Sequence, residues 1–285
     1  MQEICRALEV SRSGFYAHLR KEGRLRRRQD QELQDQLRAS FTESRETYGA
    51  PRLRHALRDR GHRCGTRRIS RLMRQLGLRV QQKRRFIPRT TDSSHGRRPA
   101  PHRLLDQPAP TEPGQVWVTD ITYIPTREGW LYLAAEIDLY SRKVVGWATA
   151  DTLETPLVLK AFERAVAQAP GRLKGLIHHS DQGSQYASEA FINALAELSI
   201  SQSMSRRGNC YDNATAESFW ATLKTECFKH SIPPSRVRAT SMIFDYIETF
   251  YNPVRKHSSL NFLSPAQFEK HTPSKTNDPV SSFST

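Results

Sequence analysis

The sequence is poor in cysteine and contains no long apolar run. Its four cysteines, Cys5, Cys64, Cys210 and Cys227, are far apart and form no CxxC pair. The sequence therefore supports neither a disulfide framework nor a tetrahedral zinc site. No apolar stretch is long enough to cross a bilayer, and no signal peptide opens the chain. These absences predict a cytoplasmic protein without a membrane partner.

Acidic residues are scarce in the first part of the chain. Residues 1–113 contain 27 Lys and Arg against 12 Asp and Glu, whereas residues 114–285 contain 17 of each. The whole of the net charge of +15 therefore arises before residue 114. A basic surface that served only solubility would be spread more evenly. The split favours a basic segment that binds a polyanion such as nucleic acid, followed by a neutral globular domain.

The basic part is predicted to be helical. Residues 1–22 have the pattern of a short helix, a turn at 9–11, and a second helix that Ser11 or Ser13 caps. Arg12 lies on this second helix and is a candidate DNA contact. We expect this helix-turn-helix-like segment to be followed by a charged connecting helix at 24–46.

A stronger helix-turn-helix pattern lies within residues 23–80, which we expect to form a helical DNA-binding domain. Pro51 suits the first turn of a helix, and Thr66 is expected to cap a second helix that Gly77 ends. The second helix carries four arginines that fall largely outside its apolar stripe: Arg67, Arg68, Arg71 and Arg74. We predict that they contact DNA, the alternative being an ordinary helical hairpin with a solvated basic face.

The rest of the chain predicts a linker and an α/β domain. Residues 81–113 are rich in Arg and Pro and indicate a basic linker. Residues 114–270 follow the order β-β-β-α-β-α-β-α-α, which predicts a mixed five-stranded sheet flanked by helices. The expected strands are 115–124, 130–140, 142–150, 175–179 and 199–204, and the expected helices 155–169, 188–198, 213–228 and 235–250. Residues 271–285 are expected to form a disordered tail.

Three carboxylates stand out within this α/β domain. Asp120 lies in the middle of an apolar strand, Asp181 follows the short strand at 175–179, and Glu217 lies on the helix at 213–228. Each alone has a plain explanation: a structural hydrogen bond, a turn residue or a solvated helix face. Brought together, they would repel one another unless cations were bound. Oxygen ligands suit Mg²⁺ or Mn²⁺, and two such ions support phosphoryl transfer.

The motifs around these acids have a specific resemblance. WVTDITYI, HSDQGSQY and GNCYDNATAESFWATLKTE resemble the three acidic motifs of DDE transposases with a retroviral integrase-like core. Between Asp181 and Glu217 lie 35 residues, the spacing typical of these enzymes. YGAPRLRHALRDRGHRCGTRRISRLMRQLGL and YNPVRKHSSLNFLSPAQF resemble further segments of the second-frame (OrfB) proteins of the IS3 family of bacterial insertion sequences. The resemblance covers about residues 1–270.

This resemblance implies a ribonuclease H-like fold and a DNA transposase. Asp120, Asp181 and Glu217 would be the catalytic ligands of two Mg²⁺ or Mn²⁺ ions, and Lys224 would contact the terminal DNA, although it could also be solvated surface. The enzyme would cleave the element ends and join them to target DNA by direct phosphoryl transfer. Its partners would be double-stranded DNA, a second copy or more of the chain, and the upstream-frame OrfA protein or a fusion with it. It would act in the bacterial cytoplasm, at the nucleoid.

Two other functions remain open from the residues alone. The basic helices would suit a DNA-binding regulator, which would leave the carboxylates without a purpose. A ribonuclease H-like nuclease that only hydrolyses would use the same metal site and differ only in its products. Among the neighbouring residues, Asp138 is expected to be structural, Asp212 and Asn213 to cap the helix of Glu217, and His178 or His179 to have at most a positioning role.

Overall fold

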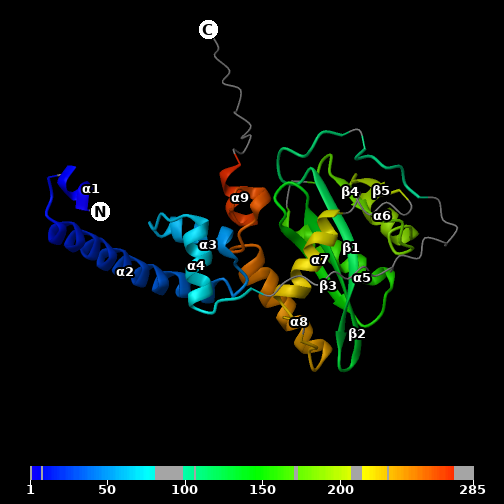
Figure 1. Cartoon of the computed structure of the whole chain (residues 1–285). Helices are drawn as coiled ribbons and strands as arrows, with labels where there is room; N and C mark the ends of the chain where they lie inside the picture. Colours follow the sequence, from blue (N-terminus) through cyan, green and yellow to red (C-terminus); the bar gives the residue numbers. More distant parts are fainter. Residues whose placement is uncertain are drawn as a thin grey trace, which may run out of the picture. The chain divides into compact units, whose positions relative to one another are not determined.

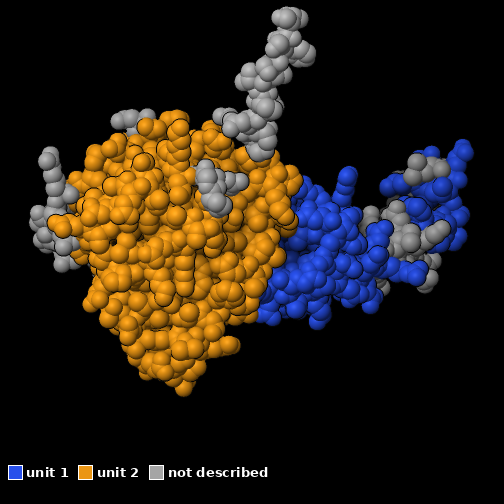
Figure 2. All heavy atoms as spheres, turned by 180° about the vertical axis from the view of Figure 1, so that it is seen from behind, with its two compact units in different colours: residues 1–81 blue, residues 82–285 orange. Residues whose placement is uncertain are grey.

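The computed structural model separates into two units, residues 1–81 and residues 82–285 (Figure 2). In its described part the first unit is helical, and the second is built on a β-sheet. The structure describes residues 2–7, 9–80, 99–105, 107–169, 173–206, 214–229 and 231–272.

The first unit begins with a short helix, α1 (Gln2–Ala7), and a long one, α2 (Arg12–Glu43). Ser11 caps α2, and its side-chain oxygen accepts a hydrogen bond of 3.0 Å from the backbone N–H of Gly14. The prediction of two helices divided near residue 23 is wrong, because α2 runs through the expected boundary between residues 22 and 23. Gly23 lies at this boundary. A single glycine costs a helix only about 1 kcal/mol relative to alanine, which is too little to end the helix without a competing cap.

The helical hairpin expected at residues 51–76 is present as α3 (Ala50–Asp59) and α4 (Thr66–Gln75). Gly77, at φ +66°, follows the end of α4 as predicted. The N-cap of α4 is Gly65 rather than Thr66, because the extended backbone of Gly65 leaves Thr66 already helical. The two helices bury the predicted apolar positions together with one side of α2, and these residues are Leu33, Leu37, Phe41, Leu53, Leu57, Ile69, Leu72 and Met73.

The second unit contains the predicted mixed sheet of five strands, in the order β3-β2-β1-β4-β5 (Figure 1). The antiparallel part consists of β1 (Val116–Thr126), β2 (Gly129–Asp138) and β3 (Val144–Ala150). Next to β1, β4 (Ile177–Ser180) and β5 (Ser201–Met204) run parallel to it. Because β4 pairs with residues 116–118, the second half of β1 has no partner strand on that side among the described residues.

Helices cover the two faces of this sheet. On one face, Trp117 and Ala134 join the core formed with α5 (Thr155–Gln168) and α6 (Glu189–Glu197). Since successive residues of a strand point to opposite faces, Val118 and Asp120 face the other side. There α7 (Ala214–Glu226) crosses β1, and α8 (Arg236–Phe244) packs on β1 and β2 (Figure 1).

The predicted helix at 235–250 changes its hydrogen-bonding pattern along its length. After α8 the chain continues as a π-helix (Asp245–Tyr251), and a final helix, α9 (Pro265–His271), follows. A capping box at Ser264 and Gln267 begins α9. The tail expected from residue 271 therefore starts within a helix, and of that segment only residues 271 and 272 belong to the described part.

Part of the segment expected to be a linker packs on the sheet. Residues 81–98 lie outside the described residues, but residues 99–105 run beside β5. The backbone N–H of Arg103 donates to Ser203 Oγ at 2.9 Å, and its Nε donates to the carbonyl oxygen of Gln202 at 3.1 Å. Residues 99–105 thus cover the edge of the sheet. None of the helices in the described part of the chain is long and apolar enough to cross a membrane.

Candidate active site

Asp120 is positioned by β1 and by a contact from α7. Its Oδ1 accepts a hydrogen bond of 2.8 Å from the backbone N–H of Ile121, and its Oδ2 accepts one of 3.0 Å from the indole Nε1 of Trp220. Trp220 lies three residues after Glu217, hence on the same side of α7. Trp220 is not among the predicted site residues, although its spacing of three residues from Glu217 is the signal that could have identified it.

Asp181 lies near Asp120, since its charge is the second largest cause of the raised pKa of Asp120. It is the first residue after β4, whose parallel pairing with β1 ends where Val118 is level with His179. Neighbouring strands are about 4.8 Å apart. The Oδ1 of Asp181 accepts a hydrogen bond of 3.0 Å from the backbone N–H of Gly183, which orients the carboxylate as the chain leaves the strand.

Glu217 lies in the first turn of α7, where its side chain is exposed. Its charge acts on Asp120, but within the described residues no three His, Cys, Asp or Glu side chains are close enough together to form a metal site. The structure therefore brings Asp120 and Asp181 together and leaves Glu217 nearby. Asp212 and Asn213, the expected caps of this helix, lie outside the described residues.

The electrostatics of the site centre on Asp120. Loss of hydration on burial, followed by the charge of Asp181 and then that of Glu217, raises its pKa from 3.8 to about 7, against the two hydrogen bonds that lower it. Partial loss of hydration also raises the pKa of Glu217. A carboxylate with so high a pKa is unfavourable as an isolated charge at neutral pH, and a bound cation would reverse the effect.

Lys224 points to the same side of α7 as the acid site. Its Nζ lies over the ring of Tyr123 of β1, 4.9 Å from the centroid. Burial lowers the pKa of Lys224, and the charge of Asp120 acts in the opposite direction. Lys224 is also the residue that the sequence resemblance gives as a DNA contact. Its positive charge lies near the carboxylates, where it is suited to hold a phosphate.

A second polar cluster lies on the opposite face of the sheet from Asp120. His178 Nε2 and Glu136 Oε2 are 2.9 Å apart, and both side chains are fully buried. The hydroxyl of Tyr186 is 3.2 Å from that of Thr119. This cluster packs against β1, β2 and β4 on that face of the sheet. The prediction overlooks Glu136, although an acid within the apolar run of β2 is the same signal that identifies Asp120 in β1.

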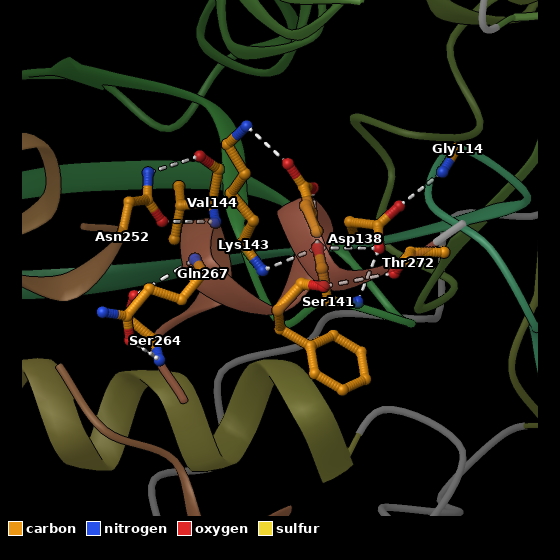
Figure 3. Close-up of polar contacts among 11 residues, drawn as sticks. Gly114, Asp138, Ser141, Lys143, Val144, Asn252, Ser264, Gln267 and Thr272 are labelled. Atoms are coloured by element: carbon orange, nitrogen blue, oxygen red, sulfur yellow. Dashed lines mark hydrogen bonds and ion pairs between the residues drawn. The ribbon is translucent and has the colours of Figure 1, made fainter. Parts of the chain in front are cut away.

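Asp138 organises the turn between β2 and β3, in agreement with its expected structural role. Its Oδ1 accepts hydrogen bonds from the backbone N–H and the hydroxyl of Ser141, at 2.8 and 3.0 Å, and its Oδ2 accepts one of 2.7 Å from the N–H of Gly114 (Figure 3). Ser141 and Lys143 also donate to Glu269 of α9, at 3.0 and 2.9 Å. The turn is thereby joined to the C-terminal helix.

The chain segment after α8 holds β3 and α7 in place. The side chain of Asn252 bonds both backbone groups of Val144, accepting at 3.0 Å and donating at 2.9 Å (Figure 3). Arg255 donates two hydrogen bonds of 2.7 Å to Glu226, the last residue of α7, and the hydroxyl of Tyr246 donates a third of 2.8 Å. These contacts attach the edge strand β3 and the end of α7 to the C-terminal segment.

In the first unit, the four arginines of α4 are not equivalent. Arg68 and Arg71 form ion pairs with Asp30 of α2, at 2.7 and 2.6 Å. Arg67, Arg71 and Arg74 are exposed, and Arg68 is half-buried. The side-chain hydrogen bond from Arg71 is the largest of the effects that lower the pKa of Asp30. Two of the four predicted DNA contacts therefore also hold α4 against α2. Arg12, in the first turn of α2, is exposed.

Families described as integrase core domains match residues 110–210 and 198–265, and an HTH-like domain family matches residues 28–86. The chain is 43% identical over 268 residues to the insertion element IS600 uncharacterized 31 kDa protein of Shigella sonnei, covering 94% of this chain and 97% of that protein. It is 40% identical over 274 residues to transposase InsF for insertion sequence IS3A of Escherichia coli (strain K12), covering 94% and 93%.

A similar relative is the transposase for insertion sequence element IS904 of Lactococcus lactis subsp. lactis (strain IL1403). It is 41% identical over 241 residues, which cover 84% of this chain and 94% of that protein. Among solved structures, a chain in the simian T-cell lymphotropic virus intasome in complex with PP2A regulatory subunit B56 gamma is 17% identical. That match has a TM-score of 0.49 and covers 79% of this chain and 73% of the other.

Proposed function

The chain belongs to the IS3 family of insertion-sequence transposases, and we propose that Asp120, Asp181 and Glu217 are its catalytic acids. The chain is a DDE-type polynucleotidyl transferase that acts in DNA transposition. The main support for these residues is that Asp120 of β1 and Asp181, directly after the paired strand β4, are close enough for their charges to interact. Glu217 is supported by its charge coupling to Asp120.

The proposed cofactor is a pair of Mg²⁺ or Mn²⁺ ions. The donors fit, since they are hard carboxylate oxygens, and burial together with their mutual repulsion raises the pKa of Asp120 to about 7. Asp120 and Asp181 would hold the ions, with Glu217 completing the set once its side chain approaches. When bound, the ions supply an activated hydroxyl nucleophile and stabilise the leaving oxygen.

The chain's own residues would position the reacting groups. Trp220 and the N–H of Ile121 fix the orientation of Asp120, and Lys224 would hold a phosphate of the terminal DNA. Attack by water would cleave one phosphodiester and leave a 3′-hydroxyl and a 5′-phosphate. Attack by that 3′-hydroxyl on a second phosphodiester would then form one phosphodiester, break another and release a new 3′-hydroxyl. No protein nucleophile is needed. Tyr186 is unsuited to that role because burial raises its pKa well above 10.

The first unit is proposed to bind the element ends. Exposed Arg67 and Arg74, with Arg12 on α2, would contact phosphates or bases, whereas Arg68 and Arg71 would have to leave Asp30 to do so. Because two DNA ends must be joined, we propose a dimer or larger assembly on DNA. It would act on bacterial DNA in the nucleoid, together with the upstream-frame OrfA protein or as a fusion with it.

A strand-transfer assay tests the acid assignment. A labelled element end is incubated with the native chain and Mg²⁺ or Mn²⁺, in parallel with Glu217→Gln and with a control, Glu197→Gln, which changes an exposed acid of α6. We expect Glu217→Gln to reduce joined product by at least about 100-fold, since even outer-sphere changes cost 10–100-fold. The control should retain full activity.

Two outcomes would contradict the proposal. Joined product that persists in Glu217→Gln would remove Glu217 from the catalytic set. Cleavage by the native chain without any joining would indicate a nuclease that only hydrolyses.

A further inference from the structure

A lysine and two aromatic rings lie in a row beside the acid site. Tyr123 lies three residues after Asp120 on β1, so its side chain leaves the opposite face of the strand. It packs edge-to-face with Trp130, with ring centroids 4.9 Å apart and planes at 85°. On α7, Lys224 covers the ring of Tyr123. Lys224 also feels the charge of Asp120, so the row begins at the acid site and ends at Trp130.

Trp130 is exposed although its backbone is fixed. Its side chain is 49% exposed. The hairpin that carries it is held by the beginning of α8: Arg236 Nε donates to the carbonyl oxygen of Trp130 at 3.0 Å, and the N–H of Arg236 donates to Glu128 at 2.8 Å. A further bond of 3.0 Å joins the N–H of Arg127 to the carbonyl oxygen of Pro233. A flat apolar ring on a fixed backbone loses little freedom when a ligand stacks on it.

The surroundings of Trp130 are mostly basic. Arg127 is exposed, and Arg236 and Lys224 are half-buried, whereas the nearby acid, Glu128, already binds the backbone of Arg236. Exposed aromatic rings interleaved with cations suit single-stranded nucleic acid, whose bases stack on the rings while the cations attract the phosphates.

From this geometry we infer that Trp130, held edge-to-face by Tyr123, is the stacking platform for an unpaired base of the DNA strand at the acid site. The inference rests on the proposed function. Trp130 lies opposite Pro125, five residues along β1 from Asp120, which is about 16 Å at 3.3 Å per residue. A stacked strand advances 3.4 Å per nucleotide, so the platform addresses a base within about five nucleotides of the cleaved phosphate.

The simpler role for this pair is to close the hairpin. Cross-strand aromatic pairs do stabilise hairpins. That role needs neither the large exposed fraction of Trp130 nor the neighbouring cations. Only the stacking role predicts that DNA affinity depends on the presence of a base in the overhang, and this dependence can be measured.

The experiment measures DNA affinity of the full chain without divalent metal, by fluorescence anisotropy. The probes are a fluorescein-labelled duplex with a five-nucleotide thymidine overhang and the same duplex with an abasic overhang. We expect Trp130→Ala to weaken binding of the thymidine overhang by about 5- to 100-fold and to change binding of the abasic probe less than about twofold. Trp130→Phe should retain most of the affinity, and Phe244→Ala, an equally exposed aromatic on α8, should not change it.

A photocrosslink provides a second, local measurement. With 5-iodouracil in the overhang, we expect the crosslinked peptide to contain Trp130 or Tyr123. Equal losses on both probes, no loss on either, or crosslinks confined to other peptides would overturn the stacking platform. Strand transfer by Glu217→Gln separates this from the catalytic proposal: if that variant is inactive while Trp130→Ala binds both probes normally, only the platform is refuted.

Discussion

Replacing Asp120 by asparagine should stabilise the metal-free protein at alkaline pH while abolishing strand transfer. In the folded chain the pKa of Asp120 is raised from 3.8 to about 7, chiefly by loss of hydration and then by the charge of Asp181. Between pH 4 and pH 7 the folded state therefore binds more protons than the unfolded state. The stability of the native chain should fall as pH rises through this window and become level above it. Because asparagine does not titrate, Asp120→Asn should remove this decrease in stability between pH 4 and pH 7.

The size of the effect follows from the difference between the two pKa values. A difference of about three pH units corresponds to about 4 kcal/mol at 1.36 kcal/mol per unit. Asp120 keeps some contact with solvent, and an asparagine accepts the bonds from Ile121 and Trp220 less well. Both effects reduce the gain, so we expect about 2 kcal/mol at pH 8.

Tryptophan fluorescence makes this measurement specific to the second unit. All four tryptophans, at positions 117, 130, 147 and 220, lie after residue 82. Urea unfolding of both proteins at pH 4, 6 and 8 in EDTA gives the free energy of unfolding as a function of pH. Repeating the series with Mg²⁺ should stabilise the native chain more than the variant, because a ligand of the folded state stabilises it by mass action.

The reasoning is refuted if the variant is the less stable protein at pH 8 without metal. It is also refuted if the difference between the two proteins does not change from pH 4 to pH 8. Either result would mean that Asp120 carries no unfavourable charge in the folded site.

Three further changes have expected outcomes. Gly146→Ala should lower the free energy of unfolding of the second unit by about 1–3 kcal/mol in the same fluorescence assay, because its Cβ would come within 2.4 Å of a backbone oxygen of α5. Arg255→Ala should cost about 3–5 kcal/mol by leaving the carboxylate of Glu226 without its guanidinium partner, and Arg255→Lys should recover only part of this loss. Asp30→Asn, which releases Arg68 and Arg71, should raise duplex affinity in a filter-binding assay by about two- to fivefold and steepen its salt dependence. A loss of affinity instead would mean that these two arginines serve only the packing of α4.

Much of the fold is readable from local patterns. The alternation of β1 and the apolar spacing of α3 and α4 depend on residues close in sequence, which is why the order of the elements along the chain and the helical hairpin are predicted correctly. Element ends are less accurate. The boundary expected between residues 22 and 23 lies inside α2, and the cap of α4 falls one residue earlier than Thr66, since a cap depends on backbone conformation rather than on residue type alone.

The acid motifs and their spacing single out Asp120, Asp181 and Glu217 without any structure. What the sequence by itself determined is therefore the order of the elements, the choice of Asp120, Asp181 and Glu217 as candidate acids, and the charge of the DNA-binding part. Only the tertiary structure decided which side chain orients Asp120 and which carboxylate pairs with the arginines of α4. Trp220 meets Asp120 across 100 residues, and Arg71 meets Asp30 across 41. Such pairs depend on how separate elements pack, which no local pattern of the chain encodes.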